Sequence, residues 1–256
     1  MITFKSDREL AKMRQAGRIV ADILRLMKDM VKPGVDTYTL DQAAEALVLK
    51  ENAKPAFKGY KVPWVSTPFP GTICASVNDE IVHGIPSRER VLQEGDIISI
   101  DTGASYNGFF GDAACTFAVG RISEDRQRLL DITLESLHRG MNTVRAGATL
   151  GDIGYAIESL VIPSGFGLVR DYAGHGIGRR LHEAPQVPNY GKPGNGITLK
   201  AGMTFCIEPM VMSGAEEVEN LSDNWTVVTA DGSDAAHFEH SLLVTPDGVE
   251  ILTPWE

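Results

Sequence analysis

Two stretches of this chain follow one pattern, LQEGDIISID at residues 92–101 and LKAGMTFCIE at residues 199–208. Each places a turn glycine ahead of an apolar run that ends in an acid, Asp101 in one copy and Glu208 in the other. The same leucine, glycine, isoleucine and acid recur at the same spacing. This recurrence indicates that the chain is built from two related halves.

A second acid follows each copy on a later predicted strand, Asp112 in the first half and Glu239 in the second. A duplicated unit whose halves each offer paired acids can place four carboxylates around a pseudo-twofold axis. Such a cluster repels itself unless cations lie within it. The acids therefore predict a site for two metal ions.

The repeat extends beyond the acids and indicates the domain organisation. Val31-x-x-Gly34 ahead of one predicted helix resembles Val144-x-x-Gly147 ahead of another. Each half has the order helix, helix, strands, and no linker separates independent domains. We expect one α+β domain over residues 1–256, with halves of about residues 1–120 and 121–256, a central antiparallel sheet and outer helices.

Periodicity and turn residues assign the secondary structure. Helical period and capping residues predict four helices, at residues 6–31, 39–50, 123–144 and 149–160. Apolar runs between turn residues predict strands at residues 72–77, 81–83, 97–106, 109–119, 203–212, 225–230 and 237–245. The segment 55–70, rich in proline and aromatic residues, is predicted to be mainly loop.

The dipeptide Asn107-Gly108 is a strong signal for a two-residue type I′ hairpin turn. Such a turn places Gly103 opposite Asp112, so that Asp101 and Asp112 become diagonal neighbours on one face. Diagonal neighbours lie roughly 7–8 Å apart at the backbone. Their carboxylates can then converge on metal ions about 3.5–4 Å apart. A bulge would break this register, so the prediction depends on a regular hairpin.

Histidine is expected to complete such a site, because imidazole suits divalent transition metals. His175 is the best candidate. It lies in GHGIG, residues 174–178, where small neighbours let the backbone and a ligand approach closely. A glycine-rich loop can instead hold phosphate, but no helix with free N–H groups clearly follows this segment.

The other histidines give less specific signals. His83 and His182 are candidates for contacts with the substrate or with the metal ligands. His237 and His240 flank Glu239, where either one orients this acid or simply packs. His138 lies on a charged predicted helix and is expected to be solvated.

Composition argues against several classes of protein. The 256 residues carry a formal net charge of -10, which disfavours non-specific binding to DNA. No apolar run is long enough for a membrane span, and the N-terminus lacks the apolar core of a signal peptide. Three cysteines are too few and too scattered for a disulfide framework. We therefore expect a cytoplasmic protein.

The charge is uneven, because a basic stripe at helical spacing lies near the N-terminus. Its members are Arg14, Arg18, Arg25, Lys28 and Lys32. The stripe is compatible with a transient association with the ribosome or with a solvated helix face. The solvated face is the favoured interpretation.

Seven short segments along nearly the whole chain carry a specific resemblance to a known family. They are PAFKGY at 55–60, ICASVN at 73–78, VHGIP at 82–86, Ile100-Asp101 with Asp112, GHGIG at 174–178, TFCIEP at 204–209 and FEH at 238–240. Through them the chain resembles the type I methionine aminopeptidases. These are metallopeptidases of the pita-bread fold, which aminopeptidase P and prolidase share.

The resemblance implies a dinuclear site with five ligands, and all five residue types are present. Asp112 and Glu239 would bridge both metals, Asp101 would complete one metal, and His175 with Glu208 would complete the other. Such ligands admit two divalent ions of Co, Mn, Fe or Zn. A water activated by the metals would attack the first peptide bond.

The resemblance also implies catalytic roles for three residues. Glu208 would pass a proton to the leaving amine, and His83 would contact the nitrogen of the scissile bond. His182 would stabilise the charge that develops on the carbonyl oxygen. The implied substrates are the N-termini of nascent polypeptides, which lose the initiator methionine when the second residue is small.

Three residues match positions that line the family's methionine pocket: Phe69, Cys74 and Trp225. Aromatic and soft apolar groups suit a thioether, although ordinary core packing would explain the same residues. A monomer is expected. The chain departs from the family in residues 61–67 (KVPWVST), which look inserted beside the pocket rim. Leu181 stands where an aromatic residue is frequent, and Cys206 replaces the commoner threonine.

Rival functions have weaker support. Proline-specific peptidases of the same fold usually carry a large extra N-terminal domain. A binding protein that had lost catalysis should lack ligands, and none is missing. A metal-dependent phosphodiesterase would need basic residues beside the acids. There is no Gly-x-Ser-x-Gly elbow and no P-loop, and no cysteine has a histidine partner in local sequence.

Overall fold

The computed structural model describes residues 2–63 and 65–256, and its long helices match the predicted ones closely. They are α1 (Asp7–Met30), α2 (Thr37–Lys50), α3 (Glu124–Asn142) and α4 (Leu150–Val161), with the short 3-10 helix η1 (Ile162–Ser164) after α4. Capping residues explain where helices begin. The Ser6 backbone N–H donates to the Glu9 carboxylate at 2.8 Å. The Asp36 carboxylate accepts from the Thr39 N–H at 2.9 Å, which starts α2 two residues before the predicted position.

The strands of the described residues form four sheets around the join between the halves. The first sheet holds β1 (Lys54–Pro55), β2 (Ile73–Val77), β4 (Ile97–Tyr106) and β5 (Phe109–Ala118). The second holds β7 (Gly174–Gly176), β8 (Glu183–Val187), β9 (Thr204–Ile207), β14 (His240–Val244) and β15 (Val249–Ile251). The third sheet holds β6 (Gly167–Leu168), β10 (Met210–Met212) and β13 (Ala235–His237). The fourth holds β3 (Glu80–Val82), β11 (Val218–Asn220) and β12 (Val227–Thr229).

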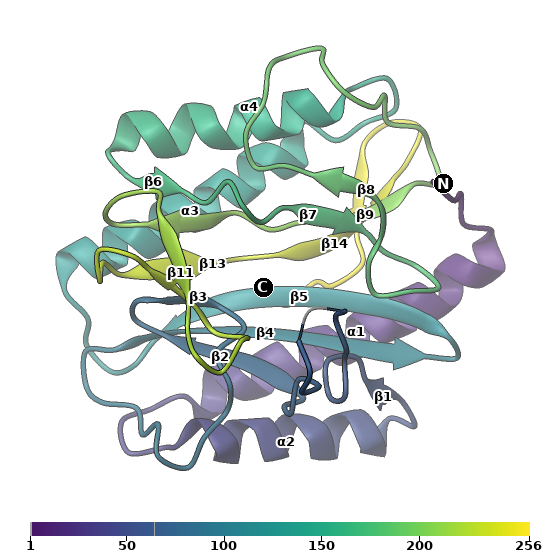
Figure 1. Cartoon of the computed structure of the whole chain (residues 1–256). Coiled ribbons are helices and arrows are strands. Elements are labelled where there is room, and N and C mark those ends of the chain that lie inside the picture. The colour runs from purple at the N-terminus through teal and green to yellow at the C-terminus, as the bar shows by residue number, and fades with distance from the viewer. Residues whose placement is uncertain (1, 64) are drawn as a thin grey trace.

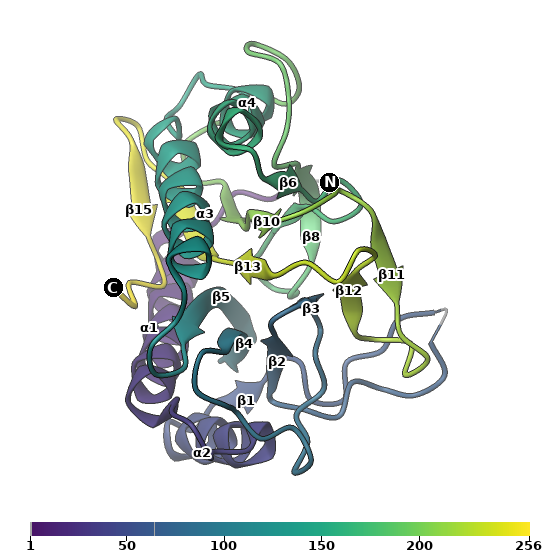
Figure 2. The same cartoon turned by 90° about the vertical axis from the view of Figure 1, so that its left-hand side faces the viewer.

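The helices cover the outer surfaces of these strands. Figure 1 shows α2 below the strands of the first half, α4 above those of the second half, and α1 and α3 behind the strands. In the view turned by 90° (Figure 2), α1 and α3 run along one side of the strands. Loops, together with β11 and β12, lie on the other side. Buried apolar side chains such as Ile23, Ile98, Leu137 and Phe205 form the core between helices and strands.

Equivalent hydrogen bonds confirm the predicted duplication. The Gly34 N–H donates to the Leu92 carbonyl at 2.8 Å, and the Gly147 N–H donates to the Leu199 carbonyl at 3.0 Å. Both glycines have positive φ, 89° and 93°, a conformation that only glycine adopts freely. In each half, this turn therefore joins the start of a helix to the leucine that opens the acid-bearing repeat.

The two halves meet along a seam between β5 and the start of β14. The Glu239 N–H donates to the Ala114 carbonyl at 2.9 Å, and the Ala114 N–H donates back at 3.4 Å. Beside this pair, the Ser241 hydroxyl donates to the Asp112 carbonyl at 2.7 Å and accepts from the Asp112 N–H at 3.0 Å. The seam thus holds the second acid of each half next to the other.

Two long predicted strands are broken in the structure, so the prediction of continuous strands was wrong. Residues 203–212 form β9 and β10, which belong to different sheets and are separated by Glu208 and Pro209. Residues 237–245 are divided between β13 and β14 at Phe238 and Glu239. Proline has no N–H with which to continue a ladder. The breaks leave the Glu208 and Glu239 side chains at strand ends.

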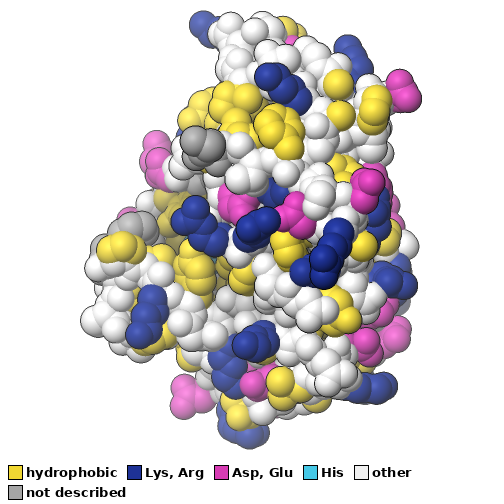
Figure 3. Space-filling view, turned by 90° about the vertical axis from the view of Figure 1, so that its right-hand side faces the viewer, with side chains coloured by type: hydrophobic (Ala, Val, Ile, Leu, Met, Phe, Trp, Pro, Cys, Tyr) yellow, Lys and Arg dark blue, Asp and Glu magenta, His cyan; other side chains and the backbone are white. Residues whose placement is uncertain are grey.

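The predicted basic stripe of α1 is partly engaged within the molecule. Arg14 pairs with Glu250 at 2.6 Å, and Arg25 pairs with Asp22 at 2.8 Å. On the face seen in Figure 3, Lys and Arg side chains are interspersed with Asp and Glu and form no continuous patch. These pairs agree with the favoured interpretation of a solvated helix face. In residues 2–63 and 65–256, no helix has the length and apolar character to cross a bilayer.

Candidate metal centre and substrate cavity

All ten residues predicted for the site line one cavity of about 560 Å³. They are Asp101, Asp112, His175, Glu208, Glu239, His83, His182, Phe69, Cys74 and Trp225. The cavity lies where the first two sheets meet, so both halves of the chain contribute to it. The structure therefore brings together every residue that the sequence nominated for the site.

The regular hairpin predicted from Asn107-Gly108 is present, and it places two of the acids. β4 and β5 pair without a bulge, with Gly103 opposite Asp112. Asp101 lies two residues from Gly103 on the same strand, so the two aspartates are diagonal neighbours as predicted. Oxygens of Asp101, Asp112 and Glu239 all lie within 4.8 Å of one another. A side chain at Gly103 would crowd the Asp112 carboxylate, since its Cβ would be 3.2 Å from Oδ1.

His175 faces this cluster. Its Nε2 is 3.8 Å from Asp112 Oδ2 and 3.7 Å from Glu208 Oε1. Its Nδ1 lies 3.0 Å from the Gly176 carbonyl, so Nδ1 carries the proton and the Nε2 lone pair points at the acids. This tautomer is the one that binds metals.

The glycines around His175 are required by packing. A Cβ at Gly174 would collide with the Cys206 carbonyl of β9, and one at Gly176 would collide with the Ala184 carbonyl of β8. β7 lies between these two strands in the sheet. The glycines therefore bring His175 close to the acids of both halves, and the phosphate-loop alternative has no support in this geometry.

The chemistry of the donors fits divalent cations. Each of the four acids has a buried oxygen without a hydrogen-bond partner in the described chain: Asp101 Oδ1, Asp112 Oδ1, Glu208 Oε1 and Glu239 Oε1. No described lysine or arginine lines the cavity. Buried carboxylates must be balanced by protons or by cations, and this oxygen and imidazole set suits divalent metals.

Without cations, the acids hold protons far more tightly than usual. Burial raises the pKa of Asp101 to about 7. Burial and then the neighbouring carboxylates raise the pKa of Asp112, Glu208 and Glu239 well above the usual value. Burial lowers the pKa of His175 to about 3, so this imidazole is already neutral above pH 6.

These shifts give a testable pH dependence of metal binding. A metal that enters the cluster must displace protons from the acids, but none from His175. We expect Mn(II) or Co(II) binding at pH 7 to release protons, and the affinity to fall as the pH is lowered from 8 to 6. Calorimetry in two buffers of different ionisation enthalpy measures the release. A pH-independent affinity without proton release would contradict this account, because it is the behaviour of ordinary exposed carboxylates with a pKa near 4.

His182 contacts both His175 and Tyr60. Its ring centroid is 4.3 Å from that of His175, and its Nδ1 is 2.6 Å from the Tyr60 hydroxyl. Burial lowers the pKa of His182, so the ring is neutral at pH 7. When Tyr60 donates to Nδ1, the remaining proton is on Nε2. No local pattern predicts this role of Tyr60, because its partner is 122 positions away.

His83 lines the cavity beside two aromatic residues. The predicted strand 81–83 ends at Val82, because His83 has φ 60°, in the left-handed region. Its ring lies edge-on to Tyr172 and Trp225, with centroid distances of 5.8 and 6.4 Å. Burial, helped by His182, lowers the pKa of His83 to about 4. His83 is therefore a neutral group held at the aromatic wall.

The two histidines that flank Glu239 have different environments. The His237 side chain lines the cavity, and its Nε2 is 3.9 Å from Glu208 Oε2. Both of its ring nitrogens are buried without a hydrogen-bond partner in the described chain. His240 instead stacks on Trp255 and bonds to Thr253. Alternation along a strand predicts that His237 and His240 point to opposite sides. It does not predict which of the two faces the cavity.

The apolar wall contains the three predicted pocket residues. Phe69 and Trp225 pack edge to face with centroids 5.3 Å apart. Cys74, on β2 opposite Asp101, connects this wall to the acids. Residues that were not predicted complete the wall: Phe57, Tyr60, Val62, Tyr172 and Met210. Leu181, at a position where the family frequently has an aromatic residue, also lines it.

The segment 61–67 is anchored at the rim of the cavity. The Trp225 indole N–H donates to the Thr67 carbonyl at 3.0 Å. The Gly59 N–H donates to the Phe69 carbonyl at 2.8 Å and the Phe69 N–H to the Tyr60 carbonyl at 2.9 Å, which closes the base of the loop. Val62 reaches the cavity wall. Residue 64, part of the predicted insertion, lies outside the described residues.

Comparisons with known proteins agree with this geometry. A model of Metallopeptidase family M24 matches residues 11–246. Methionine aminopeptidase 1 of Bacillus subtilis (strain 168) is 51% identical over 253 residues, which cover 99% of both chains. The crystal structure of the Thermotoga maritima methionine aminopeptidase has a TM-score of 0.95 and 45% identity, over 99% of both chains. The prolidase of Pyrococcus furiosus, 23% identical, covers 99% of this chain and 66% of its own with a TM-score of 0.78, which shows a shared fold. The predicted pita-bread fold is confirmed.

Proposed function

Because the chain belongs to Metallopeptidase family M24, we propose that it is a methionine aminopeptidase. It removes the N-terminal initiator methionine from new polypeptides when the second residue is small, by hydrolysis of the first peptide bond. The observation that carries this proposal is the arrangement of one cavity. Four buried acids, each with an oxygen that has no hydrogen-bond partner in the described chain, lie with His175 in this cavity. They lie beside an apolar wall built around Phe69 and Trp225.

The apolar wall suits a methionine side chain. A thioether packs favourably on aromatic edges and against other sulfur-containing groups, and the wall offers Phe69, Trp225, Cys74 and Met210. Both aromatic rings are buried. A peptide whose first side chain occupies this wall presents its first peptide bond to the acids.

We propose that Asp101, Asp112, His175, Glu208 and Glu239 hold two divalent cations. Asp112 and Glu239 lie on the seam between the halves, so they would be the acids shared by the two cations. Such cations, when bound, polarise the scissile carbonyl and lower the pKa of a water. Co, Mn, Fe and Zn all suit this donor set.

Three side chains of the protein carry out the remaining steps of the proposed hydrolysis. Glu208, at the end of β9, accepts the proton of the attacking water and passes it to the leaving amine. His83 contacts the nitrogen of the scissile bond. His182 donates from Nε2 to the carbonyl oxygen as charge develops there. Each of the three lines the cavity.

A set of three tripeptides tests the proposed substrate. Met-Ala-Ser should be cleaved by the metal-loaded enzyme, whereas Met-Lys-Ser should not, because the proposed substrates carry a small second residue. Leu-Ala-Ser should be a much poorer substrate than Met-Ala-Ser. Release of the free amino acid is measured after chelation and after return of each metal. Equal cleavage of Met-Ala-Ser and Met-Lys-Ser would contradict the proposed preference for a small second residue. No cleavage with any metal would contradict the proposed aminopeptidase activity.

We also propose a cytoplasmic, monomeric enzyme that meets its substrates as they are synthesised, with at most a transient ribosome contact. The three cysteines support the compartment, since all are buried and unpaired. Size-exclusion chromatography with light scattering tests the monomer, and co-sedimentation with ribosomes at rising salt tests the contact.

A further inference from the structure

The GHGIG segment contains one glycine that the metal centre does not explain. Gly174 and Gly176 let β7 fit between its neighbouring strands, whereas Gly178 lies in the loop between β7 and β8. A Cβ at Gly178 would collide with the side chain of Lys5. Lys5 belongs to the segment ahead of α1, and its backbone N–H donates to the Gly202 carbonyl at 3.1 Å. The glycine at position 178 therefore makes room for a lysine from a distant part of the sequence.

Lys5 forms a buried ion pair with Glu183, the residue that follows His182. Lys5 Nζ and Glu183 Oε2 are 2.8 Å apart, and the two side chains are only 3% and 9% exposed. The Thr3 hydroxyl donates to the same carboxylate oxygen at 3.0 Å. Loss of one partner of a buried pair leaves an uncompensated charge. This pair is therefore far more sensitive to substitution than an ion pair at the surface.

The other oxygen of Glu183 holds the loop that leads to His182. Glu183 Oε1 accepts from the backbone N–H groups of Arg179 and Arg180, at 2.8 and 3.1 Å. Within the same turn, the Gly178 N–H donates to the Arg180 carbonyl at 3.1 Å. The carboxylate that pairs with Lys5 thus also fixes the backbone of residues 178–180, directly ahead of His182.

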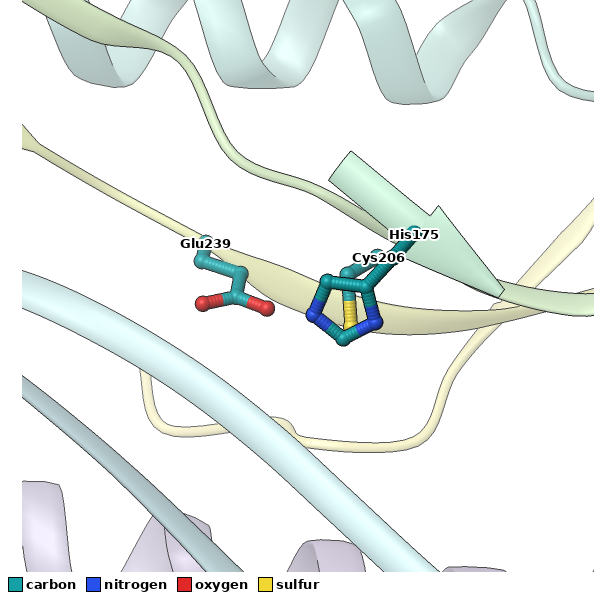
Figure 4. A group of neighbouring side chains, drawn as sticks. All are labelled: His175, Cys206 and Glu239. Carbon is teal, nitrogen blue, oxygen red and sulfur yellow. The ribbon is translucent and has the colours of Figure 1, made fainter. Parts of the chain in front are cut away.

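His182 is the group whose position this loop determines. Its ring packs edge-on against His175, with centroids 4.3 Å apart, and its Nδ1 is 2.6 Å from the Tyr60 hydroxyl. In Figure 4 the His175 imidazole and the Glu239 carboxylate project toward the same space. His182 therefore lies beside the proposed metal centre, where a misplacement of about 1 Å can cost about 100-fold in rate.

We propose that Lys5 and Glu183 are positioning residues for His182. The ion pair fixes the Glu183 carboxylate, the carboxylate fixes the loop, and the loop sets where His182 Nε2 meets the substrate. This inference rests on the proposed function, in which His182 donates to the carbonyl oxygen of the scissile bond. It makes the segment ahead of α1, remote in sequence from the site, a requirement for fast hydrolysis.

Lys5→Met tests the proposal, because methionine keeps an unbranched apolar stem but removes the charge. With metal-loaded enzyme and Met-Ala-Ser, kcat should fall by about 10–100-fold, whereas KM and metal content should change little. Gly178→Ala is a second variant, since its Cβ displaces the Lys5 side chain, and it should lower kcat in the same way. Arg14→Met is the matched control. It breaks an exposed ion pair with Glu250 and should leave kcat unchanged.

Double variants separate positioning from a general loss of stability. In the His182→Ala background, Lys5→Met should have no further effect on kcat, because the group that it positions is gone. Each variant is assayed well below its own melting temperature, and Gly178→Ala carries the measurements if Lys5→Met does not fold. Losses that multiply in the double variant, or a metal content that falls together with kcat, would overturn the proposal.

Hydrogen exchange measures the loop without turnover. In the metal-free protein, the amide hydrogens of Arg179 and Arg180 should exchange at least about 10-fold faster in Lys5→Met than in the wild type. The Ala75 amide, bonded to the Gly84 carbonyl, is the internal control and should be unchanged. Wild-type exchange and wild-type kcat in both Lys5→Met and Gly178→Ala refute this inference and leave the proposed function in place. A folded wild-type protein that is inactive with every metal overturns the proposed function, and this role of the ion pair with it.

Discussion

Asp112→Asn should reduce hydrolysis of Met-Ala-Ser by at least about 100-fold. Losing a residue that only hydrogen-bonds to a metal ligand already lowers activity by up to about 100-fold, and loss of a ligand itself should cost no less. Asp112 lies at the middle of the cluster, near Asp101 and Glu239 and 3.8 Å from His175. An amide keeps the shape but removes the negative charge, so the two proposed cations would lose a shared ligand. The metal content should fall together with the turnover, as measured by elemental analysis of the dialysed protein.

The fold should survive this substitution. Both backbone groups of Asp112 bond to Ser241, and neither bond involves the carboxylate. The metal-free variant should be more stable than the metal-free wild type, because one repulsive buried acid is gone, and thermal melts in the presence of chelator measure this. Asp131→Asn is the matched control, since Asp131 is an exposed acid on α3 that bonds only to Gln127. Full metal content and near-wild-type turnover in Asp112→Asn would show that the ligand assignment is wrong.

Those parts of the site that depend on local chemistry were predictable from the sequence. The Asn107-Gly108 turn sets the register of a regular hairpin, with φ of 49° and 79° at the two turn residues, and register alone makes Asp101 and Asp112 neighbours. The duplication of the two halves was predictable for a similar reason. A glycine with positive φ and a leucine carbonyl form the same turn twice, so the two halves fold alike.

What the sequence did not predict depends on contacts between distant segments. Glu208 and Glu239 were placed within continuous strands, whereas each lies where the chain passes from one sheet to another. Pro209 marks the first of these passages, but no local pattern marks the second, because the next sheet is built from a different part of the chain. The same holds for the bond between Trp225 and Thr67, 158 positions apart, which ties the inserted loop to the pocket wall.

His182→Ala should lower kcat for Met-Ala-Ser by about 10²–10³-fold, or roughly 3–4 kcal/mol, as expected when one donor to a developing oxyanion is removed. KM and metal content should change much less, because the side chain stabilises charge that appears mainly in the transition state. Purified variant loaded with the same metal gives both kinetic constants. A drop in metal content that matches the loss of turnover would show instead that His182 supports the centre itself.

Tyr60→Phe tests how His182 is held in its active form. The Tyr60 hydroxyl lies 2.6 Å from His182 Nδ1. When it donates there, the one N–H proton of the neutral imidazole is on Nε2, the atom available to the substrate. Without it either tautomer is allowed, so kcat should fall by about 10–100-fold while the ring and its packing remain. In the double variant with His182→Ala, Tyr60→Phe should have no further effect, because its partner is gone. Tyr155→Phe, on an exposed tyrosine of α4, is the control. Additive losses in the double variant would mean that Tyr60 acts on the substrate directly, and not through His182.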